Sequence, residues 1–331
     1  MAEHREPLLR VEHLTKFFPV KKKKLFEARR NVHAVEDVSF EVYPGETLGI
    51  VGESGSGKST LARAILALTP VTGGKVYYQG QEITDFKLSA SDRHRMRAEM
   101  QMIFQDPYAS LNPKLKVGEA IAEPMLHSGQ AKDRAEAVEK VKHLLQIVGL
   151  QPEVYDRYPH EFSGGQRQHI GIVRALAVNP KLLFCDESVS ALDVSVQAQI
   201  LNLFNDLKRK FNLTYVFIGH DLAVIRYISD RILVMYLGKV MEIVPYDQLL
   251  SEDTHPYTQA LVSAIPEPST APRTQRILLE GDIPSVVNPP KGCRFCQRCF
   301  KARPECFERE PEFRRVGEDH YVRCHFAKEA E

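Results

Sequence analysis

The sequence has neither a long hydrophobic run nor an excess of charge of one sign. No uninterrupted apolar stretch approaches the roughly 18 residues that predict a membrane-spanning helix. The 44 basic and 43 acidic residues leave a net charge of +1, which gives no sign of nucleic-acid binding. The polar opening residues are not followed by the apolar core of a signal peptide. We therefore expect a cytosolic protein that meets a membrane only through partners.

The sequence also lacks internal repeats and low-complexity tracts, and its cysteines are distributed unevenly. Cys185 stands alone, whereas the other five of the six cysteines lie between Cys293 and Cys324. In a cytosolic protein such crowding favours metal binding over disulfides. By spacing alone, a zinc ion held by four thiolates and an iron–sulfur cluster both fit, and His320 and His325 widen the zinc options. Free thiols without metal are the third alternative.

A glycine-rich loop between a predicted strand and a predicted helix carries the first functional motif. Thr47–Val51 is typical of a buried parallel strand, and an apolar helix is expected to run through Leu61–Leu68 up to Pro70. Between them, Gly52–Ser59 matches the Walker A pattern at every required position. Backbone amides and a helix N-terminus bind phosphate oxygens in such a loop. The residues predicted to bind nucleotide here are Gly52, Ser54, Gly55, Ser56, Gly57, Lys58, Ser59 and Thr60, with Ser59 also reaching Mg²⁺.

A second motif lies at the end of another predicted strand. Leu182–Cys185 is apolar and is followed at once by Asp186 and Glu187. In a phosphate-loop protein this is the Walker B position, where Asp186 holds Mg²⁺ largely through water and Glu187 is the general base that polarises the attacking water. Cys185 within the strand is expected to be an ordinary core residue.

The remaining patterns predict the organisation of the chain. Helical signals dominate from 93 to 180, where strand signals vanish, and apolar residues at helical spacing run from Val138 to Val148. Strands at 214–218 and 231–236 with an amphipathic helix over 196–207 predict a parallel sheet with crossovers. From His255 the chain becomes proline-rich and leads to the cysteines. We predict domains at 1–254, with a helical subdomain at about 93–180, and at 255–331.

The segment Phe162–Gln168 resembles the signature of the ABC transporter family, usually written LSGGQ, with Phe162 in place of Leu. Gln105 is similar to the family's Q-loop glutamine, Ser190–Asp193 to its D-loop, His220 to its switch histidine and Phe18 to its adenine-stacking aromatic residue. Two departures occur, because Ser188 replaces the usual proline and Gly219 the frequent serine.

This resemblance implies a fold and an activity. The implied fold is α/β, a P-loop NTPase with a RecA-like parallel sheet core, an inserted helical subdomain, an N-terminal antiparallel β part and a cysteine-rich C-terminal extension. ATP is then hydrolysed between two subunits, and closure of the dimer drives solute translocation. The implied catalytic groups are Glu187 and His220. The further nucleotide contacts are Phe18, Gln105, Ser163, Gly164, Gly165, Gln166 and Asp193, and the implied Mg²⁺ ligands are Ser59, Gln105 and Asp186.

The C-terminal part has a narrower resemblance, to the oligopeptide/dipeptide importer ATPases. The similar residues include the runs His255–Thr258 and Gly281–Ser285 and the cysteine pattern, and Tyr158–His160 and Val189–Ser195 also fit. In these relatives four cysteines are associated with a [4Fe-4S] cluster, which implies the ligands Cys293, Cys299, Cys306 and Cys324, with Cys296 as an extra thiol.

The same resemblance implies the partners and the location of the chain. The partners are a second, homologous ATPase in a heterodimer, two membrane permease subunits and, indirectly, an extracytoplasmic solute-binding protein. The chain would be peripheral on the cytoplasmic side of the membrane, without nucleic acid. Related ATPases also serve nickel, glutathione and sugar-like solutes, and the sequence does not separate these. A soluble ABC ATPase of DNA repair or translation is the alternative function, and a redox-sensing ATPase is a third.

Overall fold

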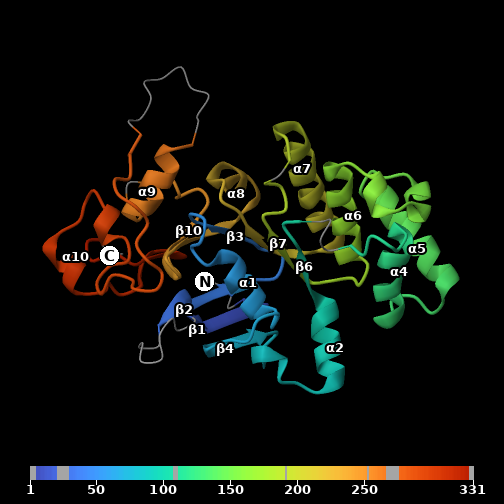
Figure 1. Ribbon diagram of the computed structural model, residues 1–331, viewed down its shortest axis with the longest axis horizontal. Helices are drawn as coiled ribbons and strands as arrows, with labels where there is room; N and C mark the ends of the chain where they lie inside the picture. The colour runs from blue at the N-terminus through green and yellow to red at the C-terminus, as the bar shows by residue number, and fades with distance from the viewer. Residues whose placement is uncertain are drawn as a thin grey trace. The chain divides into compact units, whose positions relative to one another are not determined.

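The computed structural model describes residues 5–20, 30–106, 111–190, 192–251, 253–265 and 276–327. The chain divides into two compact units (Figure 1). The first unit comprises Met1–Tyr43, Thr47–Asp85 and Gly219–Glu331, and the second comprises Pro44–Glu46 and Phe86–Ile218. Across the described ranges, no helix is both long enough and apolar enough to cross a membrane.

An antiparallel sheet opens the first unit, as predicted for the N-terminal part. Its strand order is β2-β1-β4-β5. Leu9, Val11 and Leu14 of β1 are fully buried, and an irregularity in the pairing with β2 between Val11 and Leu14 interrupts the alternation. The strands are β1 Leu9–Pro19, β2 Asn31–Val42, β4 Gly73–Tyr78 and β5 Gln81–Glu82.

A second group of strands in the same unit runs in the order β11-β12-β10-β9-β3. Strands β3 and β9 are parallel, and both were predicted. Strand β12 of the C-terminal part pairs with β10 through Glu242 opposite Val322. The sequence pattern did not predict β10, β11 or β12, so the extension is joined to the sheet more closely than expected. The strands are β3 Thr47–Val51, β9 Arg231–Tyr236, β10 Lys239–Pro245, β11 Arg314–Gly317 and β12 His320–Val322.

The helices of the first unit include the one predicted after the glycine loop. That helix ends at Ile65 rather than at Leu68, because Ala67 adopts a left-handed conformation with φ 51° and the Leu68 amide donates to Arg63 O at 2.8 Å. The helical segments are α1 Lys58–Ile65, α8 Leu222–Ile228, α9 Pro256–Ser263, α10 Pro304–Glu308 and the 3-10 turn η4 Cys296–Arg298.

Three parallel strands form the sheet of the second unit, in the order β8-β7-β6. Every residue of β7 Leu182–Asp186 and β8 Thr214–Ile218 is buried, which is typical of parallel strands covered on both faces. Both strands were predicted. Strand β6 Met100–Ile103 was not, and it corrects the expectation that strands are missing from 93 to 180. Its MQMI sequence is too short to distinguish from the end of the preceding helix.

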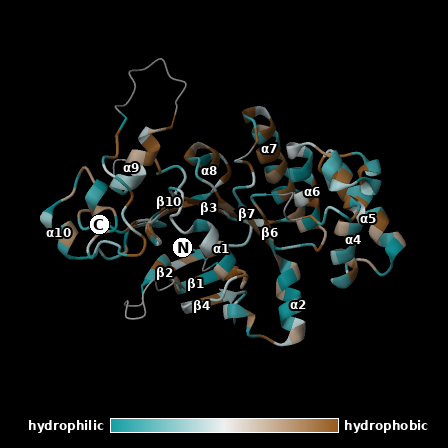
Figure 2. Ribbon diagram, viewed as in Figure 1, coloured by the Kyte–Doolittle hydropathy of each residue, from teal (hydrophilic) through white to brown (hydrophobic). Residues whose placement is uncertain are grey.

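The helices of the second unit follow the predicted periodicity. In α5, Val141 and Leu145 are buried while the opposite face is hydrophilic (Figure 2), and Gly149 at φ 79° follows its end. Helix α7 covers the amphipathic segment predicted at 196–207. The helical segments are α2 Ala90–Glu99, α4 Val117–His127, α5 Arg134–Ile147, α6 Gly164–Leu176 and α7 Val194–Phe211, with 3-10 turns η2 Pro152–Asp156 and η3 Pro159–Glu161. The 3-10 turn η1 Thr84–Phe86 begins in the first unit and ends at the first residue of this segment of the second.

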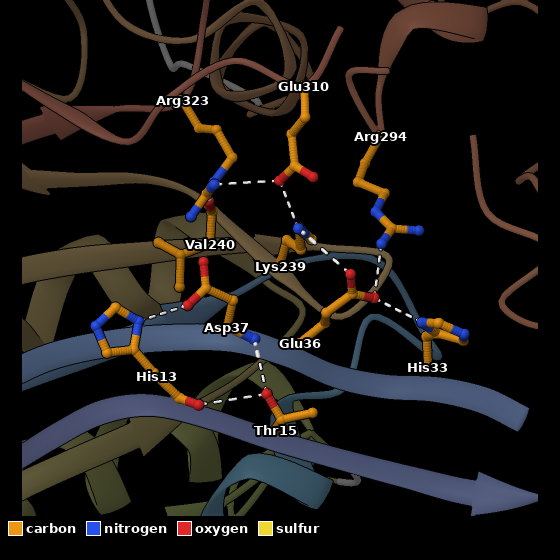
Figure 3. Close-up of polar contacts among 10 residues, drawn as sticks. All are labelled: His13, Thr15, His33, Glu36, Asp37, Lys239, Val240, Arg294, Glu310 and Arg323. Atoms are coloured by element: carbon orange, nitrogen blue, oxygen red, sulfur yellow. Dashed lines mark hydrogen bonds and ion pairs between the residues drawn. The ribbon is translucent and has the colours of Figure 1, made fainter. Parts of the chain in front are cut away.

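A network of three buried cations and two partly buried carboxylates holds the cysteine-rich part to the sheets of the first unit (Figure 3). Arg294 Nη2 donates to Glu36 Oε2 of β2 at 2.6 Å, and Lys239 bridges Glu36 and Glu310. Arg323 Nη1 also reaches Glu310, at 3.2 Å. Burial alone would raise the pKa of Glu36, but hydrogen bonding and the neighbouring cations lower it below its ordinary value. Lys239 and Arg294 therefore favour the charged form of the Glu36 carboxylate.

Candidate functional site

The predicted phosphate loop is folded around its lysine. Lys58 Nζ donates to the carbonyl oxygens of Gly52 at 2.8 Å and Glu53 at 3.1 Å, and the side chain is buried. The loop links β3 directly to α1, whose first residue is Lys58. The ammonium group thus lies inside the curve of the loop, at the N-terminus of a helix, where a phosphate group would be bound.

Two of the loop glycines are required by close backbone approach. A Cβ at Gly52 would lie 2.2 Å from Met235 O, and one at Gly57 would lie 2.1 Å from Ala34 O. Gly57 also has φ 104°, which L side chains rarely adopt. The glycine pattern of the motif therefore has a direct steric cause in the first unit.

The predicted signature segment begins helix α6 in the second unit. Ser163 is the N-cap and forms a capping box with Gln166: the Gln166 amide donates to Ser163 Oγ at 3.4 Å, and the Ser163 amide to Gln166 Oε1 at 3.1 Å. Ser163 and Gly164 are exposed, and no atom lies within 4 Å of a Cβ built on Gly164. The positive end of a 13-residue helix is thus accessible to an anion.

The acidic strand end and the predicted Q-loop glutamine meet in the second unit. Gln105 Nε2 donates to Glu187 Oε2 at 2.6 Å. Asp186, the last residue of β7, is almost completely buried. Glu187 has φ 45°, a left-handed conformation that is strained for a residue with a side chain. Such strain is maintained only where the surroundings enforce it.

Ser190 closes the turn after Glu187. Its amide and its hydroxyl both donate to Glu187 O, at 3.2 and 2.9 Å. Asp193 is the N-cap of α7, with its carboxylate accepting from the Val196 amide at 3.0 Å. The structure thus gives Asp193 a helix-capping role, while its predicted nucleotide contact stays a prediction. Ala191 of the D-loop segment lies outside the described residues.

His220 and Phe18 belong to the first unit. His220 is exposed and precedes Asp221, which caps α8 by accepting from the Ala223 amide at 2.8 Å. The side chain of Phe18 is 38% exposed, with Lys16 Nζ 4.6 Å from its ring centroid. Phe17 packs on His33 instead. Phe18 is therefore the more accessible of the two adjacent rings, as a base-stacking residue needs to be.

The five C-terminal cysteines are all free thiols. Burial raises the pKa of the Cys293 thiol to about 12 and that of Cys299 to about 11, and negative charge on Cys306 would raise both further. Negative charge on Cys306 would likewise raise the pKa of the Cys296 and Cys324 thiols. Within the described ranges, no three or more His, Cys, Asp or Glu side chains are arranged to hold a metal ion.

The two histidines considered for zinc have other partners. His320 Nε2 lies 2.7 Å from Glu242 Oε1, and His325 Nε2 lies 2.9 Å from Arg309 O. The sequence reasoning also missed two residues at the phosphate loop, Tyr257 and Arg298, both of which contact Glu53. Tyr257 lies in the run His255–Thr258, and Arg298 directly precedes Cys299, so the sequence shows only their resemblance to the importer family.

The phosphate loop, the acidic strand end and the capped signature helix define the class as a P-loop ATPase of the ABC type. The family model "ABC transporter" matches residues 35–190, and the model "Oligopeptide/dipeptide transporter, C-terminal region" matches residues 241–306. A dimeric ATP-binding cassette, MJ0796 in a post-hydrolysis state with ADP and Pi, aligns with a TM-score of 0.62 at 28% identity, over 72% of this chain and 98% of that one.

Relatives that align over nearly the whole chain show to which family of ABC ATPases it belongs. The oligopeptide transport ATP-binding protein OppF of Haemophilus influenzae is 49% identical, over 98% of both chains. AppF of Bacillus subtilis, also named an oligopeptide transport ATP-binding protein, is 48% identical over 98% of both. The di/tripeptide transport ATP-binding protein DppF of Pseudomonas aeruginosa is 46% identical, over 98% of this chain and 99% of its own. The chain belongs to the oligopeptide/dipeptide family of ABC transporter ATP-binding proteins, and it is the ATPase subunit of such a transporter.

Proposed function

We propose that the chain binds MgATP through Gly52–Ser59 and hydrolyses it with Glu187 as the general base. Lys58 would pair with the β- and γ-phosphates, and Ser59, Gln105 and Asp186 supply the oxygen ligands that Mg²⁺ prefers. Water attacks the γ-phosphorus while Glu187 accepts its proton, and ADP leaves with the electrons of the broken P–O bond. His220 would contact the γ-phosphate. Within this scheme Phe18 stacks on adenine and Asp193 lies at the nucleotide.

The catalytic unit of this proposal is a pair of subunits. The observation that carries it is the exposed start of α6, where Ser163 and Gly164 present a helix N-terminus. A second, homologous subunit can place its bound triphosphate there, against Ser163–Gln166. Nucleotide then binds the closed pair better than the open one, and this differential affinity drives closure. We propose that the second subunit is a homologous but different ATPase, so that the pair is a heterodimer.

The proposed function of the whole transporter is to import dipeptides or oligopeptides through two permease subunits. An extracytoplasmic solute-binding protein would deliver the peptides to these subunits. The ATPase would lie on the cytoplasmic face of the membrane. A cavity of about 270 Å³ in the second unit offers a contact for a permease, because Phe104 and Arg174 line it. Phe104 immediately precedes Gln105, so a partner seated there would act on the residue that holds Glu187.

We further propose that residues 255–331 form an extension to a nucleotide-binding domain at 1–254 and that the extension holds a [4Fe-4S] cluster. Cys293, Cys299, Cys306 and Cys324 would be its thiolate ligands, and Cys296 an extra thiol. The influence of Cys306 on the pKa values of the other four thiols supports a shared group. The cluster would cross-link the extension and take no part in hydrolysis.

Two variants test the catalytic part of the proposal. Lys58→Ala should abolish ATP binding, while the exposed Lys75→Ala on β4 should leave it unchanged. Glu187→Gln should retain ATP and trap dimers without turnover, seen by size-exclusion chromatography and phosphate release. Normal hydrolysis by Glu187→Gln would refute its role as base. For the extension, anaerobically purified protein should be brown and contain iron, and a colourless protein with stoichiometric zinc would refute the cluster.

A further inference from the structure

Glu53, the second residue of the phosphate loop, is held at two points by the C-terminal part of the first unit. Its backbone amide donates to Tyr257 Oη of α9 at 2.9 Å. Its carboxylate oxygen Oε2 accepts from Arg298 Nη1 at 2.7 Å. The two contacts join residues that are 204 and 245 positions apart in the sequence.

Both partners of Glu53 are fixed by burial and packing. Tyr257 is fully buried, and its ring lies 4.8 Å from that of Tyr236 and 5.2 Å from that of Phe295, centroid to centroid. The Arg298 side chain is only 9% exposed, and its Nη1 also donates to Tyr236 Oη at 3.3 Å. An ion pair at this depth keeps one geometry, unlike an exposed pair that fluctuates in water.

Glu53 also helps to fix Lys58, the lysine that we propose contacts phosphate. Glu53 O is one of the two carbonyl oxygens that accept from Lys58 Nζ. Its carbonyl group is therefore oriented by contacts on both sides of the residue, from the amide to Tyr257 and from the side chain to Arg298. Loss of either contact would allow the first turn of the loop to rotate and would misplace the lysine and the amides that follow it.

We propose that Arg298 and Tyr257 are positioning residues that set the conformation of the phosphate loop through Glu53. The cysteine-rich extension thereby contributes directly to nucleotide affinity, although none of its residues touches the nucleotide. This inference rests on the proposed role of Gly52–Ser59 in binding phosphate.

A double-mutant cycle on the full chain tests the proposal, with MgATP as the probe. Arg298→Ala and Glu53→Ala should each weaken ATP binding about tenfold, the change expected from one hydrogen bond to a charged group. The double variant should be little worse than either single variant, because both remove the same contact. In the assembled transporter the KM for ATP should rise while kcat at saturating ATP stays constant. Binding by Arg298→Ala within twofold of the parent, or a double variant equal to the product of both singles, would overturn the proposal.

Arg323→Ala is the matched control. Arg323 precedes Cys324 as Arg298 precedes Cys299, and it is equally buried, but its partners are Glu310 and Val240 O (Figure 3). The Arg323→Ala variant should bind ATP with the same affinity as the parent protein. An equal loss of affinity in Arg323→Ala would show that the effect arises from the cysteines or from general unfolding, and it would count against the proposal.

Tyr257→Phe provides a second route if Arg298→Ala does not fold. It keeps the buried ring and removes only the hydroxyl that accepts from the Glu53 amide. We expect a three- to tenfold loss of ATP affinity, about the loss of one hydrogen bond, and parent-like affinity would contradict the proposal. Lys58→Ala separates the two claims: if it abolishes binding while Arg298→Ala and Tyr257→Phe do not change it, the phosphate loop stands and only the positioning role fails.

Discussion

Gln105 donates a 2.6 Å hydrogen bond to Glu187, and the register of the sheet explains why these two residues meet. Strands β6 and β7 are parallel, with Ile103 opposite Cys185. Gln105 lies two residues beyond Ile103, and Glu187 two residues beyond Cys185. Because the carboxyl ends of parallel strands lie at the same edge of a sheet, both side chains emerge together. Any shift of the segment after β6 therefore acts directly on the proposed base.

The first prediction concerns this contact. Gln105→Leu removes the amide that orients the Glu187 carboxylate, so we expect kcat for ATP hydrolysis to fall about tenfold or more. ATP affinity should change less than about threefold, since the loop at Gly52–Ser59 makes most of the phosphate contacts. Steady-state phosphate release and equilibrium ATP binding separate these two effects.

Gln101→Leu is the control for that prediction. Gln101 lies on β6, just before the segment that carries Gln105, but its amide donates to Arg97 O and not to a catalytic group. Hydrolysis should be unaffected in this variant. Unchanged kcat in Gln105→Leu would show that the hydrogen bond does not orient the base.

Local patterns predicted those parts of the molecule whose structure is determined locally. Strands β3, β7, β8 and β9 are short apolar runs bounded by turn residues, and the phosphate loop has a fixed glycine spacing. By contrast, β6 is four residues long, and the sequence next to it is helical, so no periodicity separates the two. Helix α1 also ends at Ile65, before the predicted end at Leu68, because Ala67 adopts a left-handed conformation. An alanine in the sequence does not reveal this conformation.

Contacts between distant segments could not be predicted. The pairing of β12 with β10 and the contact of Arg298 with Glu53 join positions up to 245 residues apart. They depend on how the extension folds back within the first unit. The proposed site residues could be named from the sequence because their motifs are short. The two residues that hold Glu53 could not, because a lone arginine or tyrosine carries no pattern.

The second prediction separates the steric and conformational demands on the phosphate loop. Gly55→Ala adds a Cβ with nothing within 4 Å, so only the left-handed backbone at φ 78° is penalised, by about 1 kcal/mol. Gly57→Ala would place its Cβ 2.1 Å from Ala34 O, and backbone atoms would have to move. We expect a loss of roughly 3 kcal/mol or more, measured by urea unfolding. Equal losses in the two variants would contradict the steric account.

The third prediction concerns two serines after Glu187. The Ser188 side chain is buried, and within the described part of the chain its hydroxyl has no hydrogen-bond partner. Ser188→Ala should therefore raise the free energy of unfolding by about 1 kcal/mol. Ser190→Ala should lower it by a similar amount, because the bond from Ser190 Oγ to Glu187 O is lost. Chemical denaturation measures both, and the opposite signs are the critical result.

The fourth prediction concerns pH. His255 caps α9 with its ring nitrogen accepting from the Tyr257 amide at 3.0 Å, and burial lowers the pKa of His255 to about 3. In the unfolded chain the pKa is about 6.5, so between these values the unfolded state binds a proton that the folded state does not. Stability should thus fall as the pH drops below about 6.5, by up to roughly 1.4 kcal/mol per pH unit from this residue.

His255→Asn keeps a capping oxygen but cannot titrate. The difference in unfolding free energy between the parent and His255→Asn should grow in favour of the variant from pH 7 to pH 5. A difference that is constant with pH would show that the neutral form of His255 is not what the fold requires.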